Sequence, residues 1–200
     1  MKTITITDEQ YEKIKDEIEV EKIEKKTIKI LDRFDNSVIY ESEKTTIKEA
    51  VEEAVGKEIN LKNVNLESAN LEFANLEFAN LESANLESAN LKNANLKYAN
   101  LESANLKNVN LESANLESAN LKNANLKNVN LESANLKNVN LESANLESAN
   151  LKYANLKNVN LESANLKYAN LESAKTEFCI VNFSKEEYEI AKVFIEGLKN

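Results

Sequence analysis

A leucine occurs at every fifth position from Leu61 to Leu171, 23 times without interruption. An alanine or valine lies two positions before each leucine (isoleucine at Ile59), and an asparagine directly precedes it. The other two positions hold glutamate or lysine, followed by serine, asparagine, phenylalanine or tyrosine. This five-residue pattern extends from Ile59 to Phe183 and dominates the chain.

A period of five fits neither regular secondary structure. On an α-helix each residue turns about 100°, so leucines five apart would smear around the cylinder. In a flat strand they would point to opposite faces in turn. The conflict disappears if the chain turns a corner in every repeat, because alanine and leucine then face inward together and the asparagine between them points outward. The last position takes the corner, where serine and asparagine tolerate turn geometry and bond locally to the backbone. Repeated turns in one sense predict a solenoid of stacked, hydrogen-bonded coils.

The repeats resemble the pentapeptide-repeat family, whose motif is A-[D/N]-L-x-x, over 125 of the 200 residues. The resemblance implies a mainly β fold, a right-handed quadrilateral β-helix with four repeats per coil and about six coils in all. Within the 23 leucine repeats, the residue before the leucine is always asparagine. Glutamate after the leucine is followed only by serine or phenylalanine, and lysine only by asparagine or tyrosine. This uniformity indicates recent duplication or a consensus-built, engineered sequence, and leaves the origin open.

The first 58 residues lack the repeat and show ordinary periodicities. Residues 2–6 alternate as in a short strand, and Thr7 with Gln10 predicts the capping box of a helix. Three apolar residues share one face of this helix, namely Tyr11, Ile14 and Ile18. Residues 27–41 then predict a β-hairpin around a turn at 35–37.

A second helix is predicted between the hairpin and the first repeat. Thr46 and Glu49 form its capping box. Its apolar residues follow the spacing of an amphipathic helix: Ile47, Ala50, Val51, Ala54 and Val55. Gly56 suits the position just past the helix end.

These patterns divide the chain into an α+β N-terminal capping unit (1–58), a pentapeptide-repeat β-helix (59–183) and a C-terminal capping helix (184–200). An open end of a β-helix exposes leucines and unpaired strand edges, which caps would cover. The absence of a linker before Ile59 favours a cap over an independent binding domain at the N-terminus. The last helix is either a second cap or a dimerisation contact.

Charge and composition narrow the possible partners. The net charge of −9 divides into −5 for residues 1–58, −3 for 59–183 and −1 for 184–200. Without a basic stripe we expect no direct nucleic-acid binding and no membrane binding. The single cysteine, Cys179, falls on the inward alanine register and excludes an intramolecular disulfide. The start of the chain shows no signal peptide, so a cytoplasmic location is expected.

Catalytic chemistry has little support. The chain has no histidine, which removes the commonest base and metal ligand, and its two glycines form no phosphate-binding loop. We therefore expect no catalytic, cofactor-binding or metal-binding residues, and no cofactor. A narrow interior filled by leucine and alanine also leaves no room for a small-molecule ligand.

The outer positions offer mixed charges and a few aromatic residues. If residues 20 apart stack, glutamates and lysines form four columns, in which 14 of 20 neighbouring pairs have opposite signs. This excess is modest and favours an ordinary solvated surface. The candidate interaction surface comprises six aromatic residues: Phe73, Phe78, Tyr98, Phe178, Phe183 and Phe194. Those near the ends of the solenoid either pack under the caps or form an interface.

The sequence thus favours a non-catalytic structural or protein-interaction scaffold, which a consensus-built chain could form without a specific activity. Its partner would be another protein or a second copy, in a homodimer through a terminal cap. The alternative is a DNA-mimic protein that binds a type II topoisomerase (gyrase), as the resemblance allows. That function calls for a dense acidic track, whereas lysines interrupt every column.

Overall fold

The computed structural model describes residues 7–13, 27–177 and 179. Residues 8–13 are helical, and the predicted capping box is present: Thr7 Oγ1 accepts from the Gln10 N–H at 3.2 Å, and Gln10 Oε1 accepts from the Thr7 N–H at 2.9 Å. The strand predicted at 2–6 lies outside the described residues, as do Ile14 and Ile18.

The predicted hairpin is confirmed. Strand β1 (Ile28–Leu31) pairs antiparallel with β2 (Val38–Ser42), with a register shift between Ile30 and Leu31. The intervening turn contains Asn36 in the left-handed region (φ 59°), where asparagine is tolerated better than most residues. Ile30 is buried whereas Lys29 is exposed, which is the alternation expected of a strand with one apolar face.

The second predicted helix is α2 (Ile47–Gly56), and its capping box through Thr46 and Glu49 is present. Its buried residues, Ala50, Val51 and Ala54, belong to the predicted apolar face. The prediction for Gly56 is wrong, because this glycine is the last helical residue and has no positive φ. The left-handed residue is Glu58 (φ 57°), whose N–H donates to the Val55 carbonyl at 2.9 Å.

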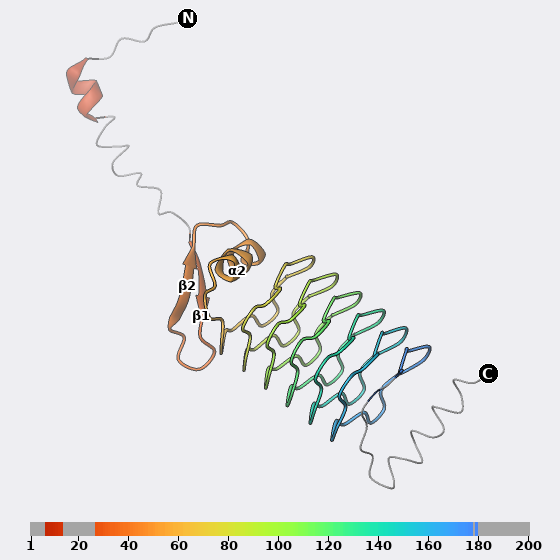
Figure 1. The fold of residues 1–200 in the computed structure, drawn as a ribbon. Coiled ribbons are helices and arrows are strands. Elements are labelled where there is room, and N and C mark those ends of the chain that lie inside the picture. Colours follow the sequence, from red (N-terminus) through yellow and green to blue (C-terminus); the bar gives the residue numbers. More distant parts are fainter. Residues whose placement is uncertain (1–6, 14–26, 178, 180–200) are drawn as a thin grey trace, which may run out of the picture.

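A solenoid follows directly after α2 (Figure 1). Residues 20 apart lie side by side in parallel β-bridges, from Asn65 with Asn85 to Asn155 with Lys175. Backbone hydrogen bonds link neighbouring coils, as where the Leu86 N–H donates to the Asn105 carbonyl at 2.8 Å. Four repeats therefore complete one coil, and the fold is a mainly β solenoid.

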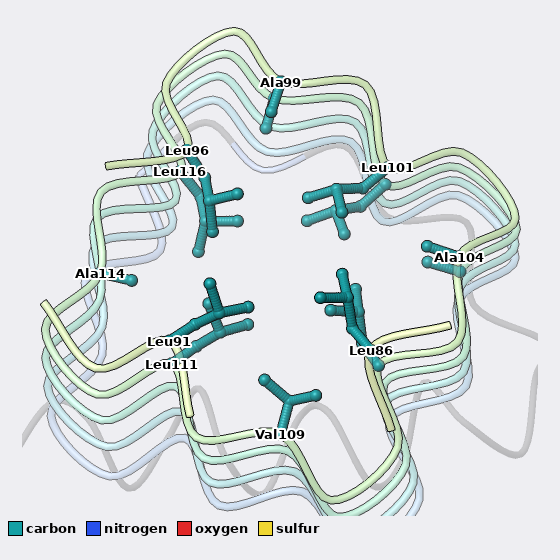
Figure 2. Close-up of a cluster of buried hydrophobic side chains, with 14 of the residues drawn as sticks. Leu86, Leu91, Leu96, Ala99, Leu101, Ala104, Val109, Leu111, Ala114 and Leu116 are labelled. Atoms are coloured by element: carbon teal, nitrogen blue, oxygen red, sulfur yellow. The ribbon is translucent and has the colours of Figure 1, made fainter. Parts of the chain in front are cut away.

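The interior is filled by the residues that the pattern directed inward. Figure 2 shows leucines from successive coils stacked above one another, with alanine or valine between the leucine columns. Leu71 to Leu151 are each at most 1% exposed, and the alanines or valines of the same coils are buried as well. Burying one leucine fully contributes about 1.5–3 kcal/mol, so the repeated leucine is the main apolar contribution to the fold.

Each corner has the same backbone geometry, whichever residue occupies it. Its second residue has a positive φ of 55° to 62° at every corner from Asn63 to Ser173. A hydrogen bond closes the turn, as from the Ala79 N–H to the Leu76 carbonyl at 3.1 Å. Counted from the leucine, this residue is the third of the four that form the turn. A positive φ at that position is the signature of a type II turn, for which glycine is the preferred residue there. No corner here uses glycine.

Hydrogen bonds and apolar packing join the N-terminal unit to the solenoid. The Asn65 N–H donates to the Leu31 carbonyl and the Arg33 N–H to the Asn63 carbonyl, both at 2.8 Å. The buried residues of α2 belong to the same apolar cluster as the first leucines of the solenoid. Figure 1 shows the hairpin and α2 side by side at this end of the stack. None of the helices in the described part of the chain is long and apolar enough to span a membrane.

Candidate interaction surface

Asparagine side chains form a ladder along each face of the solenoid. The Asn105 amide donates from Nδ2 to Asn85 Oδ1 at 3.2 Å and to Glu87 at 3.0 Å. Its Oδ1 accepts from the Lys107 N–H at 3.3 Å and from Asn125 Nδ2 at 3.2 Å. One side chain thus holds its own corner and also links three coils.

The ladder corrects two expectations about polar positions. The asparagine before each leucine was expected simply to face outward, yet within the coils its amide is half-buried and hydrogen-bonded. The corner serine or asparagine was expected to bond locally to the backbone. The asparagine before the leucine makes that bond instead: Asn75 Oδ1 accepts a hydrogen bond from the Glu77 N–H at 3.3 Å. The sequence feature that could have indicated this ladder is the asparagine before every leucine. Its amide both donates and accepts hydrogen bonds, whereas an ionised aspartate only accepts them.

Lysine–glutamate pairs connect neighbouring coils, as the 20-residue columns predicted. Lys107 lies 2.9 Å from Glu87 and Lys127 lies 2.9 Å from Glu147. Further pairs are formed by Lys62–Glu82, Lys92–Glu112, Lys97–Glu117, Lys122–Glu142, Lys137–Glu117, Lys152–Glu172 and Lys157–Glu177. Hydrogen bonds from Lys107 and then Asn105 hold the pKa of Glu87 below its usual value. Exposed pairs of this kind contribute only about 0–1 kcal/mol each.

A second polar cluster holds the hairpin against α2. The buried Ser42 hydroxyl donates to the Glu53 carboxylate, and Lys57 Nζ lies 2.9 Å from Glu53 and 2.7 Å from the Tyr40 hydroxyl. The hydrogen bond from Ser42, followed by that from Lys57, lowers the pKa of Glu53 to about 2. A carboxylate with so low a pKa is a weak base at neutral pH, so the arrangement favours a structural role.

The structure places three of the six candidate surface residues. Phe73, Phe78 and Tyr98 are 63%, 70% and 45% exposed, at corners of the solenoid. Of the two alternatives for these rings, packing under the N-terminal cap is therefore wrong for Phe73 and Phe78. Phe78 instead stacks on Tyr98, with ring centroids 5.0 Å apart and an interplanar angle of 15°, as their 20-residue spacing predicted. The other three candidates, Phe178, Phe183 and Phe194, lie outside the described residues.

A feature that sequence reasoning missed is the pairing of each corner tyrosine with its own lysine. The nitrogens of Lys97, Lys152 and Lys167 lie 4.9–5.0 Å from the ring centroids of the tyrosines that follow them. This is within the range of a cation–π contact. Within the repeats, every corner tyrosine follows a lysine. This rule was visible in the sequence and could have suggested these contacts.

Cys179 is half-buried against the apolar core, as its inward register predicted. Its thiol donates to the Leu156 carbonyl at 2.9 Å, and burial raises its pKa. A raised pKa lowers the thiolate fraction and hence the reactivity at neutral pH. Within the described ranges, acidic residues and Cys179 form no group that could hold a metal ion.

Family models match the solenoid directly. The model for the pentapeptide repeat region matches residues 98–171, and the model for pentapeptide repeats (8 copies) matches 59–97 and 74–112. Together these matches cover residues 59–171, more than half of the chain. The chain belongs to the pentapeptide repeat family. No curated protein sequence matches the chain.

Solved structures of pentapeptide repeat proteins resemble parts of this chain. One is HetL from the cyanobacterium Nostoc sp. strain PCC 7120, described as involved in heterocyst differentiation regulation, at 32% identity over 58% of this chain with a TM-score of 0.43. The match spans 61% of the HetL chain. Another is Rfr23 from the cyanobacterium Cyanothece 51142, at 32% identity over 59% of this chain and 88% of its own, with a TM-score of 0.42.

A third resemblance is to QnrB1, described as a plasmid-mediated fluoroquinolone resistance protein. Its identity with this chain is 16%, over 68% of this chain and 84% of its own, with a TM-score of 0.36.

Proposed function

We propose that the protein is a non-catalytic scaffold that presents a protein-interaction surface on a rigid solenoid. The observation that carries this proposal is that different positions of each repeat have different structural roles. Leucine and alanine fill the interior, asparagine and backbone groups bind neighbouring coils, and two corner residues per repeat face solvent. Surface variation at those two positions leaves the fold unaffected, which is what a scaffold requires.

The proposed architecture is a right-handed, quadrilateral β-helix of about six coils over residues 59–183. In this proposal residues 1–58 cap one end through the hairpin and α2. The helix predicted at 184–200, which would cap the other end, lies outside the described residues. The hydrogen bonds from the first coil to β1 and the burial of Ala50, Val51 and Ala54 support the N-terminal cap. The C-terminal cap and the cytoplasmic location stay predictions.

The DNA-mimic alternative would require acidic groups along the whole solenoid. Residues 66–90 carry five glutamates and no lysine, whereas residues 91–177 carry ten lysines and nine glutamates. Most of the outer surface therefore mixes both charges and does not imitate a polyanion. This distribution favours the scaffold over binding of a topoisomerase through DNA mimicry.

A supercoiling assay with purified gyrase separates the two functions. A scaffold leaves supercoiling unchanged at micromolar protein and gives no protection against a fluoroquinolone. Inhibition or protection would favour the DNA-mimic alternative. A parallel screen for hydrolase and transferase turnover tests the absence of catalysis, and turnover that copurifies with the chain would overturn the scaffold proposal. Light scattering on the full chain measures whether a second copy is the partner.

A further inference from the structure

The exposed corner rings of the solenoid differ in whether the chain itself supplies a cation. Tyr98, Tyr153 and Tyr168 each have the nitrogen of the preceding lysine over the ring. Phe73 and Phe78 follow glutamates, and among the described residues no lysine or arginine lies over either ring. Phe73 and Phe78 are 63% and 70% exposed, so both rings are open to a partner.

The carboxylates beside these phenylalanines form no ion pair in the described part of the chain, although Lys92 acts on Glu72 and Lys97 on Glu77 at longer range. Among the described residues, the side chains of Glu72 and Glu77 accept hydrogen bonds only from amides of the next coil, Asn90 at 3.5 Å and Asn95 at 3.2 Å. The lysines stacked above them form ion pairs on their far side, Lys92 with Glu112 at 2.9 Å and Lys97 with Glu117 at 3.9 Å. In the described part of the chain, no basic nitrogen lies within 4.0 Å of either carboxylate.

We propose that Phe73 and Phe78, with Glu72 and Glu77, form a docking surface for an arginine-containing basic segment of a partner protein. This inference rests on the scaffold function and names its binding surface. A guanidinium group stacks on an aromatic ring while its N–H groups reach an adjacent carboxylate, so each Glu-Phe corner offers both halves of one arginine site. The stacking of Phe78 on Tyr98 holds one ring in place before binding, which reduces the entropic cost.

Charge decides between the candidate occupants. The surface lies in residues 66–90, which carry five glutamates and no lysine. Two of these glutamates, Glu82 and Glu87, are paired with Lys62 and Lys107 of neighbouring coils. The excess of acidic groups that is left attracts a cationic segment and repels a nucleic acid. A second copy of the chain carries a net charge of −9, which disfavours its docking there. Arginine is favoured over lysine because its planar group stacks on the ring and binds a carboxylate in two places.

The test measures binding of the full chain to a fluorescein-labelled decapeptide in which arginine alternates with serine. Fluorescence anisotropy at low and at physiological salt gives the affinity. Matched peptides with lysine or with neutral citrulline in place of arginine serve as controls. We expect the arginine peptide to bind more tightly than the lysine peptide, and the citrulline peptide not to bind.

Two double variants separate the rings from the general charge. In F73S/F78S, serine replaces both phenylalanines at corners where it is already common, such as Ser83 (φ 55°). The variant Y153S/Y168S removes the same number of rings from corners that already have a lysine. We expect F73S/F78S to weaken arginine-peptide binding at least about fivefold and Y153S/Y168S to change it less than about twofold.

A second pair of variants keeps every ring and replaces glutamate by glutamine of the same size. A loss of binding in these variants is therefore not caused by misfolding after the removal of large side chains. E72Q/E77Q removes the charges of the two glutamates beside the phenylalanines, and E102Q/E132Q removes two glutamates elsewhere that likewise accept an asparagine amide, at 3.1 Å each. We expect the first to weaken binding and to flatten its salt dependence, and the second to change both less. Circular dichroism and melting verify that all four variants keep the solenoid.

Three outcomes would overturn the docking surface: no binding of the arginine peptide at about 100 µM, equal losses in F73S/F78S and Y153S/Y168S, or a dimer that F73S/F78S abolishes. The last would assign the surface to a second copy. These outcomes are measured by peptide binding and oligomeric state, whereas the scaffold function is tested by catalytic turnover and gyrase supercoiling. A failure of the docking surface can therefore be distinguished from a failure of the scaffold function.

Discussion

Two segments of the solenoid share a backbone but not a surface. The acidic segment, residues 66–90, contains five glutamates and no lysine of its own, whereas the mixed segment, residues 91–177, is nearly neutral. Their interiors match, since Leu76 and Leu136 occupy the same column and are both 0% exposed. Their corners match too, with φ of 62° at Phe78 and 61° at Asn138. The fold is therefore independent of what the two outer positions carry.

This independence follows from how a solenoid distributes its contacts. Each coil contacts only its neighbours, and the buried and half-buried groups that make those contacts are leucine, alanine, asparagine and backbone amides. Glutamate, lysine and the corner rings also reach neighbouring coils, as in the Lys107–Glu87 pair and the Phe78–Tyr98 stack. Exposed ion pairs of this kind contribute little to stability. A binding surface can therefore occupy one segment at little cost to folding, and the segments should respond alike to inward changes and differently to outward ones.

The largest effect is expected for leucine truncation, which tests the shared interior. Leu76→Ala and Leu136→Ala should each lower the free energy of unfolding by about 2–5 kcal/mol, because each leaves a cavity in a filled core. Urea denaturation followed by circular dichroism measures both. Similar losses would show that the segments are equivalent inside. A loss below about 1 kcal/mol at either site would contradict a rigid, fully packed interior.

A smaller effect that differs between the segments is expected for the asparagine ladder. Asn130 Nδ2 donates to Asn110 Oδ1 at 3.2 Å, and its Oδ1 accepts from the Glu132 N–H and from Asn150. Asn70, in the same column, begins its ladder: its Oδ1 accepts two bonds, but no coil precedes it to accept from its Nδ2.

Removing these amides should reflect that difference. Asn130→Ala should cost about 1–3 kcal/mol because it leaves half-buried partners unsatisfied, and Asn70→Ala should cost about half as much. Thermal melting of the two single variants measures the comparison. Equal costs would show that the ladder contributes through the local corner bond alone, and a larger cost at Asn70 would contradict the ladder altogether.

The sequence predicted most of the fold because its patterns are local. A period of five could be reconciled with a buried leucine only by a corner in each repeat, and both capping boxes, at Thr7 and Thr46, depend on residues three apart. Gly56 was misjudged because the left-handed residue after a helix is usually glycine, whereas here Glu58 takes that conformation as the chain enters the first coil.

The candidate surface was harder to predict because it depends on distances between coils. The sequence placed Phe78 above Tyr98 through the 20-residue register, and the structure confirms the stack. It could not decide whether Phe73 and Phe78 lie beneath the N-terminal cap, since that depends on how α2 is seated. The half-buried asparagine amides were also missed, because alternation alone assigns a position to a side and not a hydrogen-bonding role.

The smallest effect is expected at the corners, where backbone strain should be the same in both segments. Ser83 (φ 55°) and Ser143 (φ 58°) occupy one column in a conformation that disfavours side chains with a Cβ. Ser83→Gly and Ser143→Gly should each stabilise the chain by about 0.5–1 kcal/mol, since relief of strain exceeds the added flexibility of the unfolded state.

Calorimetric melting would record this gain as a rise in Tm, and Ser143→Ala, which retains the Cβ, should give none. Because both corner N–H groups donate to the next coil at 2.8 Å and glycine keeps that donor, the gain should not depend on the segment. A gain confined to Ser143 would mean that the acidic segment already relaxes its corners, and the two segments would then differ in backbone as well as in surface.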